Sequence, residues 1–100
     1  MSRASAPHAD WVDVAGERLE FARYAPQRAG VPLVFLHEGL GSVAAWRDFP
    51  RAVCDALRAP GLAYSRRGYG RSTPMAGPRA PDYLHREAWQ VLPAVLDHFA

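Results

Sequence analysis

The stretch from residue 33 to residue 42 reads LVFLHEGLGS, and it combines an apolar run with a glycine-rich turn. Four consecutive apolar residues precede His37, and Gly39 and Gly41 follow within the next four positions. A short run that is apolar at every position is typical of a strand covered on both faces. Glycines without side chains let backbone N–H groups approach a ligand closely. We therefore expect a buried central strand that ends in a turn facing a negatively charged atom.

The residues before this stretch predict a β-hairpin. The Ala15-Gly16 pair is typical of a tight turn between two apolar segments. After the turn, Leu19 and Phe21 recur with the period of a half-exposed strand. We expect residues 1–10, which are mostly small and polar, to be disordered.

Helical and strand patterns alternate after the turn. Apolar residues recur at three- and four-residue steps from about Ala44 to Arg58, which predicts an amphipathic helix. GLAYS, residues 61–65, predicts another short strand, and residues 82–99 predict a last helix with Asp82 as its N-cap and a kink at Pro93. Such alternation indicates parallel pairing with helices on the faces of the sheet. The predicted fold class is α/β, a β-hairpin followed by β-α-β-α with parallel central strands.

Composition and charge exclude several classes of function. The net charge is +2, and the 12 basic residues, all arginine, form no patch interleaved with aromatic residues, so we expect no nucleic-acid partner. No apolar run approaches the roughly 20 residues of a membrane span, and the first residues lack a signal-peptide pattern. We therefore expect no membrane partner and a cytoplasmic location. Cys54, the single cysteine, is predicted to be a small core residue, and Glu87 and Asp97 to lie on solvated helix faces.

Two interpretations of the turn compete. Gly39, Gly41 and Ala44 complete the G-x-G-x-x-A spacing of a dinucleotide-binding turn, and arginines after the next strand would suit an NADP phosphate. A hairpin before the strand is unusual for such a domain, however, and the Glu38 carboxylate would repel a pyrophosphate. In the other interpretation, the turn supplies a backbone N–H to an oxyanion hole, as acyl-transfer enzymes require.

Two segments resemble the α/β-hydrolase fold superfamily. PLVFLHEGLGS, residues 32–42, is similar to its third strand and His-Gly loop, and YSRRGYGRS, residues 64–72, is similar to its Asp-x-Arg-Gly-x-Gly-x-Ser segment after the fourth strand. The order of elements also agrees, so the resemblance covers residues 11–100. It implies the N-terminal part of an α/β-hydrolase domain, incomplete in this chain.

The resemblance also implies roles for individual residues. His37 corresponds to the loop histidine, and Glu38 occupies the place of a glycine, so we expect its side chain to turn outward or to bind an arginine. Gly39 takes the position of the oxyanion-hole N–H donor, with Leu40 as the alternative. His37, Glu38 and Trp46 are candidate substrate-binding residues. No metal and no cofactor are implied.

The segment after the fourth strand departs from the pattern at one position. Ser65 replaces the usual aspartate, so we expect its bracing contact to be missing. Gly68, Gly70 and Ser72 match the pattern, and we interpret them as turn geometry.

No serine of the chain lies in the G-x-S-x-G motif that presents the nucleophile in this fold. We therefore expect a chain that stops before the nucleophile elbow and is catalytically incomplete alone. The predicted function is the N-terminal segment of a serine-type hydrolase of an ester, thioester or related acyl bond in a small-molecule substrate. An NADP-binding Rossmann-type oxidoreductase domain and a non-catalytic binding protein of the same fold remain alternatives. We also expect the isolated chain to self-associate through an unpaired edge of the strand at residues 33–36.

Overall fold

A computed structural model of the chain describes residues 10–39, 41–75 and 77–99. The tail at residues 1–9 and the alternative donor Leu40 lie outside the described residues. None of the helices in the described ranges has the length and apolar character needed to cross a bilayer.

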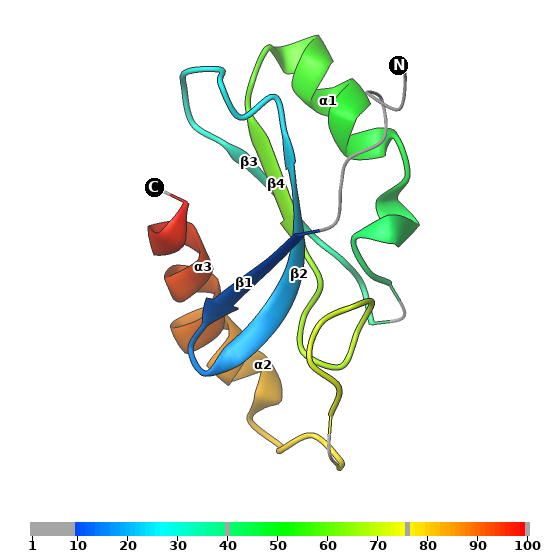
Figure 1. The fold of residues 1–100 in the computed structure, drawn as a ribbon, viewed down its shortest axis with the longest axis vertical. Helices are drawn as coiled ribbons and strands as arrows, with labels where there is room; N and C mark the ends of the chain where they lie inside the picture. The colour runs from blue at the N-terminus through cyan, green and yellow to red at the C-terminus, as the bar shows by residue number, and fades with distance from the viewer. Residues whose placement is uncertain (1–9, 40, 76, 100) are drawn as a thin grey trace.

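The described strands form one mixed sheet. Its order is β1-β2-β4-β3, with β1 at Asp10–Val14, β2 at Glu17–Tyr24, β3 at Leu33–Leu36 and β4 at Gly61–Tyr64. The pairs β1–β2 and β2–β4 are antiparallel, whereas β3 and β4 are parallel. Helices α1 (Phe49–Leu57) and α3 (Leu92–His98) lie on opposite sides of the sheet (Figure 1). The predicted α/β class, with a hairpin followed by parallel strands and helices, is confirmed.

The hairpin turn has the geometry that its sequence predicts. Ala15 and Gly16 both have positive φ, 50° and 77°, and Val14 pairs with Glu17 directly across the turn. Two consecutive positive φ angles are the requirement of a type I′ turn, whose twist matches that of the flanking strands. The turn therefore sets the register of β1 against β2.

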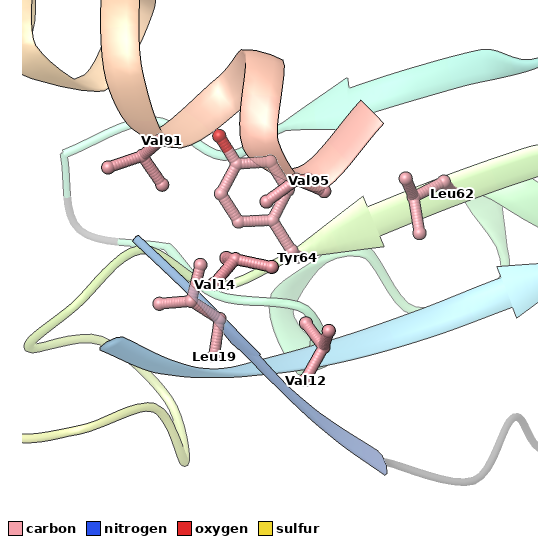
Figure 2. Packing of buried hydrophobic residues seen from close by; sticks show 7 residues of the cluster. All are labelled: Val12, Val14, Leu19, Leu62, Tyr64, Val91 and Val95. Carbon is pink, nitrogen blue, oxygen red and sulfur yellow. The ribbon is translucent and has the colours of Figure 1, made fainter. Parts of the chain in front are cut away.

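Each face of the sheet buries its own apolar cluster because successive side chains of a strand point to opposite faces. The cluster toward α3 contains Val12, Val14, Leu19, Leu62, Tyr64, Val91 and Val95. In Figure 2, the Tyr64 ring extends from β4 toward Val91 and Val95. The cluster toward α1 contains Ala22, Tyr24, Phe35, Val43, Cys54 and Ala63. Cys54 is thus a core residue, as predicted, and β2 is covered on both faces instead of half-exposed.

The strand covered on both faces is β4, not β3. Every residue of β4 is buried. Strand β3 was predicted to be covered on both faces; it lies at the edge of the described sheet and pairs only with β4, which agrees with the unpaired edge expected for residues 33–36. Its Leu36 is 49% exposed, and Val34 lines an open hollow of about 550 Å³ between the sheet and the end of α3. Two short apolar runs look alike in sequence, and only their neighbours in the sheet decide which is central.

The first predicted helix is divided into two pieces. A 3-10 turn, η2, spans Ala44–Trp46, and α1 begins only at Phe49. Arg47 between them has φ 53° and ψ −129°, which interrupts the helix. Pro50 explains the break, because in a continuous helix its ring would clash with the carbonyl of Trp46 and it has no N–H to donate.

The last predicted helix contains a π-helical turn. Helix α2 (Tyr83–Arg86) continues through the π-helical turn η3 (Glu87–Val91) into α3. Pro93 has no N–H to donate to residue 89, so the hydrogen-bond pattern widens just before it, as the predicted kink implies. Asp82 is the N-cap residue of α2, as predicted, although its side chain makes no capping hydrogen bond.

Glu87 is buried, whereas the sequence predicted that it would lie on a solvated face of the helix. It is 7% exposed rather than solvated, because it shares the inward side of the helix with Val91 and Val95. Burial, together with the nearby Glu17 carboxylate, raises the pKa of Glu87.

Candidate active site

Parallel pairing of β3 with β4 brings the two glycine-containing loops together. Leu36 pairs with Tyr64, so the residues that follow each strand, His37 and Ser65, emerge at the same edge of the sheet. The carboxyl ends of parallel strands are where open α/β sheets bind ligands. Both motifs found in the sequence therefore meet at one place in the fold.

His37 joins the two loops through both ring nitrogens. Its Nε2 accepts a hydrogen bond from the backbone N–H of Arg66 at 3.0 Å, so Nδ1 carries the proton and donates to the Glu38 carbonyl at 2.7 Å. The Arg66 Nη1 donates in return to the His37 carbonyl at 2.8 Å. His37 is 5% exposed, and this geometry is that of a residue that braces the two loops. A contact of His37 with substrate stays a prediction.

We expect the stability of the protein to fall as the pH drops below about 6.5. Burial, and secondarily the Arg66 charge, lower the pKa of His37 from its ordinary 6.5. Below pH 6.5 the unfolded chain binds a proton at this histidine, whereas the folded chain does not until the pH falls below its own lower pKa. Between these two pKa values the free energy of unfolding decreases with falling pH, by no more than about 1.4 kcal/mol per pH unit for one proton. Thermal unfolding between pH 7.5 and 5.5 checks this. His37→Gln should flatten the profile relative to the exposed-site control His85→Gln, and equal profiles for both variants would contradict it.

The turn after His37 is open around Gly39. A Cβ built on Gly39 meets no atom within 4 Å, and within the described ranges its N–H donates to no backbone carbonyl. Gly41 closes the turn by donating its N–H to the Glu38 carbonyl at 3.0 Å. The Glu38 side chain is exposed. Gly39 is an exposed residue, and a backbone N–H in a turn after a strand is a candidate oxyanion donor.

A hollow of about 180 Å³ adjoins this turn, lined by His37, Glu38, Gly41, Ser42, Ala45 and Trp46. Trp46 contributes both to the hollow and to the core. Its ring stacks on Phe49 at 5.8 Å and meets Phe35 edge-on at 5.5 Å. The three candidate substrate-binding residues, His37, Glu38 and Trp46, are thus brought together, and their contact with substrate stays a prediction.

Ser65 makes two hydrogen bonds where the resemblance places an aspartate. Its Oγ accepts the Val43 N–H at 2.8 Å and donates to the Glu20 Oε1 at 2.9 Å. The same Oε1 accepts the Arg71 N–H at 3.0 Å. The expected loss of a brace is therefore compensated, since a carboxylate from β2 occupies this region.

Gly70 and Ser72 belong to the same network. A Cβ on Gly70 would lie 2.4 Å from the Glu20 Oε1 and 2.7 Å from the Ser65 Oγ, and Gly70 has a φ of 52°. The Ser72 Oγ accepts the Glu20 N–H at 2.8 Å and donates to the Ser65 carbonyl at 2.5 Å. As predicted, these residues shape a turn, and this turn packs against the buried Glu20 carboxylate.

Glu20 is the residue that sequence reasoning missed. Strand periodicity assigned it to a solvated face, yet it is 4% exposed. The absence of an aspartate at position 65 was the available signal, because the matching turn still needs an acceptor for its backbone N–H groups.

Three solved structures place this architecture among known folds. An α/β-hydrolase fold protein from Burkholderia ambifaria aligns with a TM-score of 0.69 and 23% identity over 94% of this chain and 33% of its own. The epoxide hydrolase CorEH aligns with a TM-score of 0.70 and 20% identity over 95% and 30%. The thioesterase domain from the curacin biosynthetic pathway aligns with a TM-score of 0.59 and 15% identity over 93% and 31%.

These likenesses show the fold. The chain has the architecture of the N-terminal part of an α/β-hydrolase, and it spans about 30% of the length of the structures it matches. No family model matches the chain, and no curated protein is significantly similar to it in sequence.

Proposed function

We propose that this chain is the N-terminal segment of a serine-type α/β-hydrolase that cleaves an ester, thioester or related acyl bond. It provides the scaffold and one oxyanion-hole donor, the Gly39 N–H. The observation that supports this proposal is the exposed turn after β3, where the space around Gly39 is open and the neighbouring residues His37 and Trp46 line a hollow.

The chemistry requires a nucleophile from another segment. An α/β-hydrolase places its nucleophile on a sharp strand-to-helix turn, followed in the chain by an acid and a histidine. Ser65 and Ser72 are buried and engaged in the Glu20 network. In the described residues no histidine hydrogen-bonds to a serine hydroxyl. The proposal therefore requires the nucleophile, the acid and the catalytic histidine to come from polypeptide after residue 100.

Two alternatives are weaker. An NADP-binding domain has an open, mostly parallel sheet, whereas β2 here runs antiparallel to both of its neighbours. A non-catalytic protein of the same fold would keep the hollow without a nucleophile. The sequence that follows in the gene distinguishes this last alternative.

The test begins with the gene downstream of residue 100. We expect it to encode G-x-S-x-G within the next strand and turn, and the extended protein to hydrolyse p-nitrophenyl esters or acyl thioesters. The matched control is the same protein with that serine changed to alanine, which should lose turnover, and the 100-residue chain alone should show none. Turnover of epoxides rather than esters would overturn the acyl assignment. Absence of an elbow would overturn the enzymatic one, and NADPH binding at micromolar concentration would favour the oxidoreductase.

A further inference from the structure

We propose that Glu20 is a positioning residue that fixes the turn after β3 by way of Ser65. This inference rests on the proposed function for its effect on catalysis, but its effect on the turn can be measured without any activity. Neither Glu20 nor Ser65 touches the hollow beside Gly39, so both act through the backbone of the turn.

The Glu20 carboxylate lies at the centre of the three segments that build the site. It projects from β2, whose Glu20 carbonyl accepts the Ser65 N–H at 2.9 Å just beyond the end of β4. Its Oε1 accepts one hydrogen bond from the Ser65 hydroxyl and one from the Arg71 N–H. Glu20 thereby connects β2, the end of β4 and the glycine-rich turn of residues 66–72.

Ser65 links Glu20 to the turn after β3. The Val43 N–H donates to the Ser65 Oγ at 2.8 Å, and Val43 itself is buried. The other end of the turn is attached to the same segment, through the two hydrogen bonds between His37 and Arg66. Gly39 therefore lies on a span of chain fixed at both ends. The Glu20–Ser65 bond orients the hydroxyl so that its lone pair faces the Val43 N–H.

The energetics favour a carboxylate at this place. A hydrogen bond with an ionised acceptor is about twice as strong as one between neutral groups. Without the Glu20 oxygen, the buried Ser65 hydroxyl and the Arg71 N–H would both lose their acceptor. A donor buried without a partner is costly, so the turn would shift to find one. A shift of about 1 Å in a catalytic group is enough to cost roughly 100-fold in rate.

The arrangement also explains why position 65 is not an aspartate. An aspartate there would bring a second carboxylate against the Glu20 Oε1, and two carboxylates sharing one buried site repel each other. Glu20 with Ser65 satisfies the turn here, and we expect an aspartate at position 65 to be tolerated only with a neutral residue at position 20. The two positions should therefore be interdependent.

The decisive measurement is amide hydrogen exchange at Val43 and Gly41 in the extended protein. We expect Glu20→Ala to accelerate exchange of both amides at least about 10-fold, because their turn loses its anchor. Glu20→Gln should accelerate exchange much less than Glu20→Ala, since its side-chain oxygen can still accept both hydrogen bonds, although more weakly than a carboxylate. Asp97→Ala, which removes an exposed carboxylate on α3, is the matched control. Unchanged exchange in Glu20→Ala, or equal acceleration in Glu20→Gln, would overturn the inference even if the protein proves inactive.

Steady-state kinetics give the second readout where the extended protein is active. Glu20→Ala should lower kcat by about 10- to 100-fold with little change in KM, and Glu20→Gln should restore it. Ser65→Asp should be impaired, and the double variant Ser65→Asp with Glu20→Ala less so. Loss of thermal stability in Glu20→Ala with kcat unchanged would show that Glu20 supports the fold without positioning the turn. If no variant or wild type hydrolyses any substrate while exchange responds as expected, the proposed function fails and the positioning role stands.

Discussion

Gly70→Ala is expected to lower the free energy of unfolding by about 2–5 kcal/mol. The left-handed φ of 52° costs an alanine roughly 1–2 kcal/mol. Its Cβ would also lie 2.4 Å from the Glu20 Oε1 and 2.7 Å from the Ser65 Oγ. Relieving such overpacking costs about a further 1–3 kcal/mol. Both atoms belong to a buried network with several hydrogen bonds, so neither can move away without breaking one.

Gly16→Ala is the matched control, because it separates backbone strain from steric conflict. Gly16 also has a positive φ, 77°, but a Cβ there meets nothing within 4 Å. It should therefore cost only the backbone strain of about 1–2 kcal/mol. Urea denaturation of both variants gives the comparison. Equal losses would show that the Glu20 network moves freely and does not constrain the turn.

The parts of the fold that the sequence predicted are those set by local chemistry. The Ala15-Gly16 pair predicts its own turn, and the hairpin follows from it. The alternation of short apolar runs with amphipathic segments predicts the order of strands and helices. Pro50 and Pro93 indicated where helical hydrogen bonds would be lost. They did not indicate that the helix would be divided before Pro50 or that a π-helical turn would precede Pro93.

The parts that the sequence did not predict depend on which elements become neighbours. LVFL and GLAY are both four-residue apolar runs, and periodicity does not say which has a strand on each side. The sequence predicted that Glu20 and Glu87 would be exposed, because charged residues on strands and helices usually face solvent. Glu20 is buried because the end of β4 and the loop that follows it pack over its carboxylate. Glu87 is buried because it lies on the same side of its helix as Val91 and Val95. Burial of charge is a tertiary property, and no local pattern encodes it.

The candidate site divides in the same way. His37, Gly39 and the glycine-rich turn after β4 were predicted from motifs, because the chemistry of a backbone donor demands particular residue types in a fixed order. The support for that donor was not predicted. It comes from Glu20, 45 residues away from Ser65 in the chain, and only the pairing of β2 with β4 brings the two together.

The edge of β3 is the feature with the largest expected effect on the state of the isolated chain. In the described sheet, β3 pairs on one side only, with β4. Val31 and Val34 line the hollow of about 550 Å³, and Val31 and Leu36 are 83% and 49% exposed. An apolar strand edge with unpaired N–H and C=O groups is a template for pairing with another chain.

We therefore expect the 100-residue chain to self-associate at micromolar concentration, the range in which exposed edges commonly aggregate. Leu36→Lys should shift it toward monomer, because a charge on the edge strand opposes close pairing and covers part of the apolar face. Leu57→Lys is the matched control, since Leu57 is also exposed but lies at the end of α1 and not on a strand. Sedimentation velocity across a concentration series measures the effect. Monomeric wild-type chain throughout the series, or an equal response of the two variants, would show that the edge of β3 does not drive association.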